Sequence, residues 1–381
     1  MDNSLKKIIS EGLASLSNAF KSSGSTSEAL GIDIGSSAIK VVQLKKKGGK
    51  AVLETYGVIS LGPYGNTDVG AVTVLKTEDI VRALVDVMRE SNVTTKQAVV
   101  SIPSLSSLIF TISLPGNIEE SQLSKIVPME ARKYIPVPIG EVTLDWFVIP
   151  QEAEFLENSG TSSEGKEPQK QPTEVLVVAI HNDLLSQYQE ILKKTDLHSD
   201  SFEMEIFSNI RSSFNHEQAP VMLVDFGASK TKVSIVENEV VRVFHVVNRG
   251  SQDISRNISQ SLSIPFVEAE KLKREVGLNA SIDERVEKIS RASINYIFAD
   301  INSIVFAYEK KYNKTISKVF LAGGGSILKG LLDVAKENFK VEVVYSNPFS
   351  KTQTPAFLNP ILETSGPEFV VAVGLALRQL S

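Results

Sequence analysis

"LGIDIGSSAIKVVQL", residues 30–44, consists of two short apolar runs joined by a turn of small and charged residues. Short apolar runs on either side of such a turn predict the two strands of a hairpin. The stretch holds an acid, three small residues and a base: Asp33, Gly35, Ser36, Ser37 and Lys40. Small residues let backbone amides approach an anion closely, and a carboxylate can hold Mg²⁺ through water. The hairpin therefore predicts half of a triphosphate site, in which Asp33 holds the metal and Lys40 supplies an ammonium group.

Two later stretches carry the same kinds of residue. "VDFGASKT" at 224–231 repeats the order of apolar strand, acid, glycine and small-residue turn, and "LAGGGS" at 321–326 is a glycine loop before a helix. We expect Asp225 to be the second residue that holds Mg²⁺ through water. The other candidate nucleotide-binding residues in these stretches are Gly227, Ala228, Ser229, Gly323, Gly324, Gly325 and Ser326. Each motif alone is more often an ordinary turn, so the prediction of a nucleotide clamp rests on all three in order.

The composition of the 381 residues excludes several classes of site. Cysteine is absent and the four histidines lie far apart, which excludes disulfides, thiolate metal sites and cysteine nucleophiles. The net charge is −5 and charges of both signs spread along the chain, so no basic field is expected to hold nucleic acid. The longest apolar run near the end, 369–377, is shorter than the roughly 20 residues of a membrane span. We therefore expect a cytoplasmic protein with more than one hydrophobic core.

The three motifs resemble those of the actin-like ATPase superfamily in order and spacing, over essentially all of residues 30–380. "DIGSSAIK" is similar to the first phosphate loop, "LAGGGS" to the adenosine motif, and "VDFGASKT" to the second phosphate loop, with Lys230 where a small hydroxyl residue is usual. The resemblance implies an α/β, actin-like (ribonuclease H-like) two-lobed fold that binds ATP and Mg²⁺ between its lobes. "AEKLK" at 269–273 resembles the helix that contacts adenosine, which implies this role for Glu270 and Lys273. A solvated ion pair between these two residues is the alternative.

Two further features narrow the resemblance. An insert after "VVSIP" at 99–103 takes the position of the inserted α+β subdomain of FtsA. "EARKYIPVPIGEVTLDWFVI" at 130–149 and "VAVGLALRQ" at 371–379 resemble the PilM family of type IV pilus assembly proteins. This resemblance implies a nucleotide-binding scaffold, peripheral at the inner membrane, that binds the cytoplasmic N-terminal peptide of PilN and other pilus machine components. The implied peptide groove lies between the first lobe and the insert, with one wall that contains Glu130, Arg132, Lys133 and Ile135.

The pattern of strands, helices and polar stretches divides the chain into parts. We predict an amphipathic helix and flexible tether at 1–29, a first lobe at 30–104 completed by 197–219 and 366–381, an inserted subdomain at 105–196 with a disordered loop near 153–172, a second lobe at 220–247 and 316–365, and a helical subdomain of the second lobe at 248–315. Because the hairpin of the second lobe repeats that of the first, we expect an internal duplication.

Two other functions remain open at this point. An active actin-like ATPase would need an acid or amide near the first lobe's connecting strand to orient the attacking water. "SIPSLSSLIF" at 101–110 holds no Glu, Asp or Gln, so we expect at most slow ATP hydrolysis. A filament-forming membrane tether like FtsA would normally end in an amphipathic helix, whereas we expect this chain to end at its last packed helix. The helix predicted in 1–29 could take that role, and self-association is left open.

Overall fold

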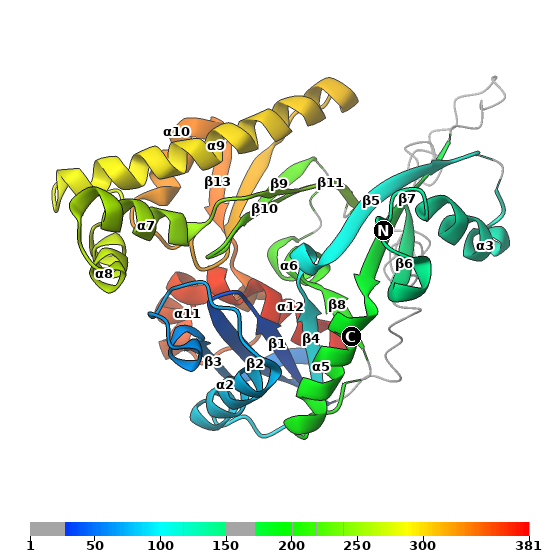
Figure 1. The fold of residues 1–381 in the computed structure, drawn as a ribbon, viewed down its shortest axis with the longest axis horizontal. Helices are drawn as coiled ribbons and strands as arrows, with labels where there is room; N and C mark the ends of the chain where they lie inside the picture. The colour runs from blue at the N-terminus through cyan, green and yellow to red at the C-terminus, as the bar shows by residue number, and fades with distance from the viewer. Residues whose placement is uncertain are drawn as a thin grey trace. The chain divides into compact units, whose positions relative to one another are not determined.

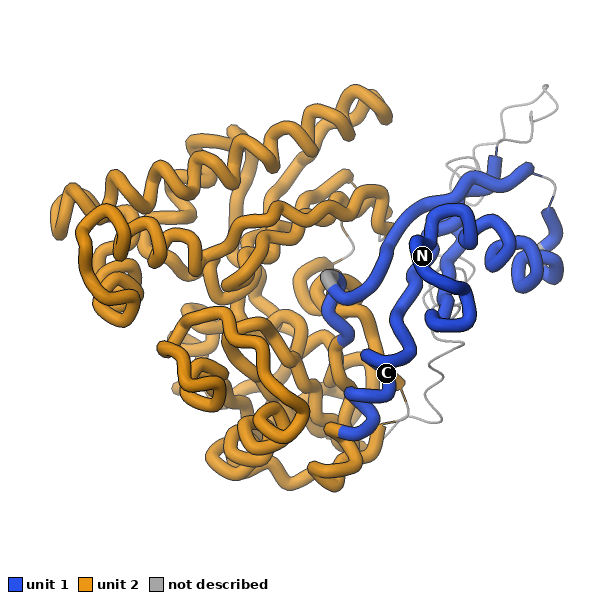
Figure 2. Tube along the Cα trace, in the orientation of Figure 1, with its two compact units in different colours: residues 1–23, 102–190 blue, residues 24–101, 191–381 orange. Residues whose placement is uncertain are grey.

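The computed structural model describes residues 27–116, 118–149, 172–199, 201–215, 217, 219–238 and 240–380. The chain divides into two compact units, residues 1–23 with 102–190, and residues 24–101 with 191–381 (Figure 2). We call them the smaller and the larger unit. The predicted N-terminal helix and almost all of the loop predicted near 153–172 lie outside the described residues.

The first sheet of the larger unit contains the hairpin of residues 30–44. Its strand order is β3-β2-β1-β4-β8. The strands are β1 (Glu28–Ile34), β2 (Ala38–Lys47), β3 (Lys50–Ser60), β4 (Ala98–Ile102) and β8 (Phe202–Met204). β1 runs antiparallel to β2 and parallel to β4, so residues 30–44 form the predicted hairpin. Helix α2 (Thr77–Glu90) contacts β2 and β3 and buries Ala83, Leu84 and Val87 on one face.

Helices α6 (Glu205–Ser213) and α12 (Val370–Leu380) pack against each other, and α12 also packs against β1 and β2. Two glycines permit this close backbone contact. A Cβ atom at Gly31 would lie 2.9 Å from the carbonyl carbon of Ala372, and one at Gly374 would lie 2.6 Å from the carbonyl carbon of Ser208. Because side chains cannot be accommodated there, β1 and α6 are held directly on α12.

Within the described residues, one helical stretch, Ala356–Leu380, is long and apolar enough to cross a membrane, and 61% of its most apolar window is buried inside the protein. It includes α11 (Asn359–Ser365) and the buried α12. The packing of α12 on β1 and α6 explains its apolar composition as that of a core helix.

The second sheet of the larger unit repeats the arrangement of the first. Its strand order is β11-β10-β9-β12-β13. The strands are β9 (Val221–Phe226), β10 (Thr231–Glu237), β11 (Val240–Val247), β12 (Lys318–Ala322) and β13 (Glu342–Tyr345). As in the first sheet, three antiparallel strands are followed by a strand parallel to the first of them. This shared topology is the internal duplication that the two hairpins predicted.

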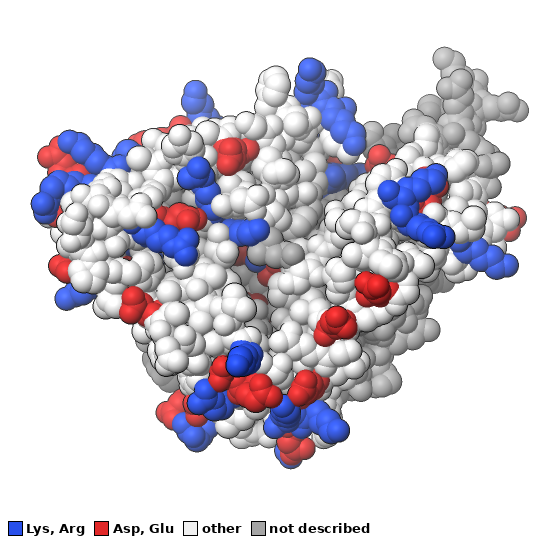
Figure 3. Space-filling model, in the orientation of Figure 1, with Lys and Arg blue, Asp and Glu red and all other residues white. Residues whose placement is uncertain are grey.

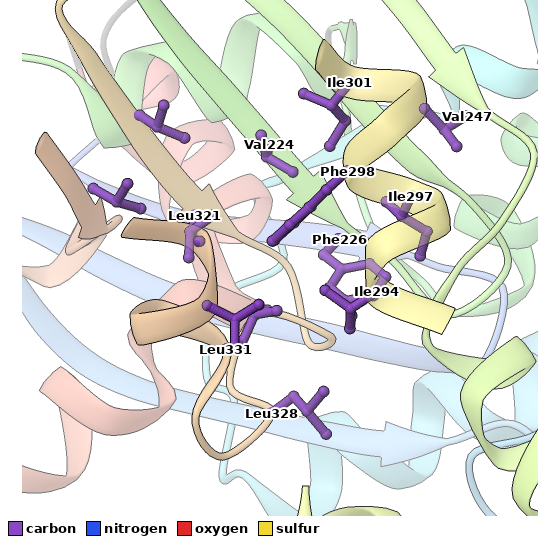
Figure 4. Packing of buried hydrophobic residues seen from close by; sticks show 14 of the residues in the cluster. Val224, Phe226, Val247, Ile294, Ile297, Phe298, Ile301, Leu321, Leu328 and Leu331 are labelled. Atoms are coloured by element: carbon purple, nitrogen blue, oxygen red, sulfur yellow. The ribbon is translucent and has the colours of Figure 1, made fainter. Parts of the chain in front are cut away.

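Four helices accompany this second sheet (Figure 1). They are α7 (Ser251–Leu262), α8 (Phe266–Val276), α9 (Glu284–Tyr312) and α10 (Leu331–Phe339). Apolar side chains of α9, including Ile294, Phe298 and Ile301, meet Val224 and Phe226 of β9 in the core of this lobe (Figure 4). The core therefore fixes the end of β9, where the second motif begins, against the long helix α9.

The smaller unit has its own antiparallel sheet in the order β5-β7-β6. Its strands are β5 (Ser107–Leu114), β6 (Val142–Ile149) and β7 (Thr173–His181), and its helices are α3 (Glu120–Ala131) and α5 (Asn182–Lys194), whose last turn belongs to the larger unit. Val127 of α3 packs with Ile112 and Val175 in a separate apolar core. On the face drawn in Figure 3, basic and acidic side chains are interspersed.

Short 3-10 turns complete the described elements: η1 (Gly62–Gly65), η2 (Ser104–Ser106), η3 (Ile139–Glu141), η4 (Pro348–Lys351), η5 (Ala356–Leu358) and η6 (Gly366–Phe369).

Candidate nucleotide-binding site

The three sequence motifs come together around one cavity of about 510 Å³ in the larger unit. The turn after β1, the turn after β9 and the loop after β12 each contribute to its lining. All the candidate nucleotide-binding residues line this cavity except Ser229 and Ser326. The Ser326 hydroxyl is buried and donates to the carbonyl oxygen of Gly323 at 2.7 Å, so it stabilises the glycine loop instead of lining the cavity.

The three glycines of the third motif have different roles. Gly323 has φ +82°, and a Cβ atom there would overlap the Asp225 carboxylate. Gly325 donates its N–H to the carbonyl oxygen of Phe226 at 2.7 Å, and a Cβ atom at Gly325 would lie 2.7 Å from the same oxygen. At Gly324 the nearest atom to a Cβ would be Glu368 Oε2 at 3.9 Å. The outer two glycines therefore pack on the end of β9, and the middle one presents bare backbone to the cavity.

Each of the two aspartates is paired with a lysine directly opposite it in the hairpin. Asp33 lies opposite Lys40, with 3.6 Å between Oδ2 and Nζ, and the Ser101 hydroxyl donates to Oδ1 at 3.2 Å. Asp225 lies opposite Lys232, with 3.1 Å between Oδ2 and Nζ. Asn209 Nδ2 also donates to Asp225 Oδ2, at 3.2 Å. The duplication thus places the same acid–base pair on both sides of the cavity.

Lys232 lines the cavity but was missed in the sequence analysis, which singled out Lys230 as the unusual residue. The signal was present, because an aspartate precedes a lysine by seven positions in both hairpins, 33 to 40 and 225 to 232. Glu205, the first residue of α6, accepts from Lys232 Nζ at 2.7 Å. Burial alone would lower the pKa of Lys232, but the carboxylates of Asp225 and Glu205 outweigh it and raise that pKa. Lys232 is therefore a fixed cation between two acids.

Glu270 and Lys273 of α8 form a buried ion pair rather than a solvated one. Their side chains are 7% and 9% exposed, and Glu270 Oε2 lies 2.6 Å from Lys273 Nζ. Ser255 Oγ donates to Glu270 Oε2 at 2.6 Å, and Arg274 Nε donates to Oε1 at 2.7 Å. Burial would raise the pKa of Glu270, but Lys273 and the other donors hold it below its usual value. Glu270 therefore lines the cavity as a carboxylate that is already bonded to Ser255, Lys273 and Arg274.

A loop of the first lobe reaches this ion pair from the other side of the cavity. Gly70 has φ +85°, and a Cβ atom there would lie 2.8 Å from Glu270 Cδ. Two residues later, the N–H of Val72 donates to Gln252 Oε1 on α7. The loop after η1 thus joins the first lobe to α7 and α8 at the edge of the cavity, which no local pattern in 61–76 had indicated.

Asp33 and Asp225 are candidate ligands for Mg²⁺. The described residues contain no group of three or more His, Asp or Glu side chains that could hold a metal by themselves. Asp33 and Asp225 both line the cavity, and Mg²⁺ in phosphate sites commonly takes one or two carboxylates together with water and phosphate oxygens. The donor set fits a magnesium ion that arrives with a phosphate ligand.

The candidate partner-binding residues lie in the smaller unit at the end of α3. Arg132 and Lys133 are exposed, and Lys133 Nζ lies 2.8 Å from Glu130 Oε2. Ile135 is 8% exposed and belongs to the core of this unit. The sequence analysis missed two exposed apolar side chains beside them, Met129 and Tyr134, which are 74% and 51% exposed. This end of α3 therefore exposes two basic and two apolar side chains, while Ile135 packs in the core of the smaller unit.

Comparisons with known proteins identify the family. A family model described as type IV pilus assembly protein PilM matches residues 31–380. The cell division protein FtsA of Neisseria meningitidis serogroup B is 23% identical over 314 residues, which cover 75% of this chain and 72% of FtsA.

Two solved structures share the fold. One described as a PilM–PilN type IV pilus biogenesis complex has a TM-score of 0.77 and 22% identity, covering 94% of this chain and 100% of that chain. The ethanolamine utilization protein EutJ of Carboxydothermus hydrogenoformans has a TM-score of 0.52 and 15% identity, covering 98% of both chains. These likenesses confirm the predicted actin-like fold. The match over residues 31–380 shows that this chain belongs to the PilM family of type IV pilus assembly proteins.

Proposed function

We propose that this protein is a cytoplasmic scaffold of the type IV pilus machine, which binds ATP with Mg²⁺ in the cavity of its larger unit. Its second ligand is the cytoplasmic N-terminal segment of a PilN-type inner-membrane protein, which holds it at that membrane. The observation that carries the proposal is the meeting of three small-residue turns and two Asp–Lys pairs at one cavity.

The phosphate end of the nucleotide fits between the two hairpin turns. Ser36, Ser37 and Ala228 line the cavity and are small enough for a phosphate to approach their backbone amides. Lys40 and Lys232 supply ammonium groups from equivalent positions of the two hairpins. Gly324, whose backbone is open to the cavity, and the ion pair of Glu270 and Lys273 also line the cavity, and the adenosine would lie against them.

The charge of the lining favours a nucleotide that brings its own cation. Five acids in the lining are balanced by five bases: Asp33, Glu205, Asp225, Glu270 and Glu368 against Lys40, Lys232, Lys273, Arg274 and Lys329. A free triphosphate would add a large uncompensated negative charge to this partly enclosed site. A bound Mg²⁺ neutralises part of the phosphate charge, and Asp33 and Asp225 are the residues that would hold it through water.

The same lining supports slow hydrolysis at most. Glu205 of α6 is one of the acids at the cavity that could orient an attacking water. Its Oε2 accepts from Lys232 Nζ at 2.7 Å, so its negative charge is already neutralised. The FtsA-like membrane tether stays an alternative, and the amphipathic segment on which it depends lies outside the described residues.

The smaller unit supplies the surface for the PilN-type segment. Met129 and Tyr134 offer apolar contacts, and Arg132 and Lys133 offer positive charge, all at the end of α3. A segment that is disordered when free can lay alternate apolar side chains on such a surface, with moderate affinity because ordering it costs free energy. The solved structure described as a PilM–PilN complex supports a PilN-type partner. The full groove stays a prediction.

The nucleotide proposal can be tested by calorimetry with MgATP. Asp33→Ala removes the carboxylate that holds the metal's water, and Gly323→Arg places a long side chain where even a Cβ overlaps Asp225. Each change should lower ATP affinity at least about a hundredfold, the equivalent of about 2.7 kcal/mol. Ser229→Ala is the matched control, because Ser229 belongs to the second motif but not to the cavity lining. Unchanged affinity in both variants would contradict the clamp.

A further inference from the structure

A second cavity, of about 890 Å³, lies in the larger unit between strand β11 and helix α9. Among the described residues β11 is an edge strand, since the sheet order β11-β10-β9-β12-β13 leaves one of its sides without a neighbour. Figure 1 shows α9 above the strands of this sheet. Strand edge and helix together form a groove, lined on β11 by residues such as Val243 and His245 and on α9 by Ser303 and Ala307. The nucleotide site uses none of these residues.

The hydrogen-bond alternation of the hairpins shows which β11 residues face the free side. Gly227 donates its N–H to the carbonyl oxygen of Lys230 at 3.1 Å, so this pair is hydrogen-bonded. Bonded and non-bonded pairs alternate along an antiparallel ladder, so Lys232 directs its backbone groups to β9 and Val233 directs its own to β11. Val233 lies opposite His245. The neighbours of His245, Phe244 and Val246, therefore turn their N–H and C=O groups away from β10, and Val246 also lines the groove.

A buried arginine marks one end of the groove. The Arg242 side chain is 8% exposed, and its Nε lies 3.3 Å from Glu237 Oε2. Neither Nε nor Nη2 of Arg242 has a hydrogen-bond acceptor among the described residues. Two buried N–H groups without a well-aligned acceptor are costly, and a carboxylate from outside could accept from them beside Glu237. Lys311 of α9 lies at the same end of the groove and adds a second positive charge.

The other end of the groove holds two carboxylates and one arginine. Arg249 stacks over the ring of Tyr296, with 4.7 Å from its Cζ to the ring centroid, while Asp253 and Asp300 contribute two carboxylates to the lining. Asp300 and Lys311 are both exposed on α9. Eleven helical residues span about 16 Å, which is the length of about five residues of extended strand. The groove therefore runs along the edge of β11, with Lys311 near one end and Asp300 near the other, about 16 Å apart along α9.

We propose that β11 binds an extended segment of another protein by strand addition. The segment lies antiparallel to β11 and carries an acidic residue for Arg242 and Lys311 and, four or six residues away so that both side chains face α9, a basic residue for Asp300. Its backbone pairs with the outward groups of Phe244 and Val246, and alternate side chains pack on α9. This surface belongs to the larger unit and is independent of both sites in the proposed function.

The test uses the full chain and two fluorescent, end-blocked heptapeptides, Glu-Thr-Val-Thr-Val-Thr-Lys and Lys-Thr-Val-Thr-Val-Thr-Glu, measured by fluorescence anisotropy. A segment antiparallel to β11 has its N-terminus at the Asp300 end of the groove, so the peptide that begins with Lys should bind at least about tenfold more tightly than the one that begins with Glu. Val246→Pro removes an outward N–H and leaves the ladder intact, so it should weaken that binding about tenfold, whereas Val246→Thr should leave it within about twofold.

A charge swap gives an independent readout at exposed positions. The double variant Asp300→Lys with Lys311→Glu should reverse the peptide preference, with thermal melting as the folding control. Equal binding of the two peptides, binding of neither, or an unreversed preference in the folded double variant would overturn the proposal. So would a wild-type dimer in sedimentation that Val246→Pro dissociates, since the edge would then bind a second copy of this chain.

Discussion

Replacement of Lys232 by methionine tests whether the cation between Asp225 and Glu205 holds the two-lobed unit together. The ammonium lies 2.7 Å from Glu205 Oε2 and 3.1 Å from Asp225 Oδ2, and these two acids are only 6% and 7% exposed. Methionine keeps the length of the side chain but leaves both carboxylates in place without their cation. Removing one partner of a buried ion pair typically costs about 3–5 kcal/mol. Because the Lys232 side chain is 16% exposed, we expect the lower end, about 3 kcal/mol.

The assay is urea unfolding followed by far-UV circular dichroism at pH 8, because the single tryptophan, Trp146, lies in the smaller unit. The pKa of Lys232 is raised above its ordinary value of 10.5, so its stabilisation is complete below pH 10.5 and is lost only as the pH rises through the folded-state pKa. The wild type at pH 8 therefore retains the whole contribution. Lys230→Met is the matched control in the same hairpin, and it should change the free energy of unfolding by less than about 0.5 kcal/mol.

Magnesium provides a second readout of the same variant. With Lys232 gone, Asp225 and Glu205 can bind Mg²⁺, which stabilises the folded state by about 1.4 kcal/mol at a concentration ten times the Kd. The wild type without nucleotide should respond much less, because the Lys232 ammonium already lies between the two acids and repels a second cation. A loss below about 1 kcal/mol in Lys232→Met, or an equal magnesium response in both proteins, would refute the reasoning.

Two further predictions concern other charged groups. Burial would raise the pKa of Glu203, but Arg211, Arg378 and Ser208 hold that pKa below its ordinary value of 4.5. The ionised Glu203 therefore stabilises the folded state fully above pH 4.5, and this contribution is lost as the pH falls through the lower folded-state pKa. Glu203→Gln should accordingly flatten the fall in urea midpoint between about pH 5 and pH 3, and an unchanged slope would remove Glu203 from the acid transition. Substituting Glu for both Arg132 and Lys133, which are exposed on the smaller unit, should weaken binding of a labelled PilN-type N-terminal peptide at least about tenfold without unfolding the protein. Undiminished anisotropy from a folded double variant, with MgATP binding intact as the control, would move the peptide site away from α3.

The candidate site was predictable from the sequence as far as its parts were local. Asp33, Gly35 and Lys40 form a hairpin because strand alternation and turn chemistry depend on a few consecutive residues, and the same holds for Asp225 and Gly227. The glycine loop at 321–326 was predictable for the same reason, since consecutive glycines indicate that the backbone lies close to a ligand or to another segment. Ser229 and Ser326 show the limit: motif membership does not say which side chain faces the cavity.

The sequence by itself determined the two hairpins, their order along the chain and their pairs of acid and base seven positions apart, because each depends on neighbours in the chain. Only the tertiary structure decided that Glu205 meets Lys232 across 27 positions, and that the loop at Val72 reaches Gln252 across 180. It also decided that Ile135 is buried while Met129 is exposed, and that β11 is the edge of its sheet among the strands that the structure describes. These contacts follow from how helices and sheets pack on one another, and residues far apart in the chain meet only when that packing satisfies all their surfaces together.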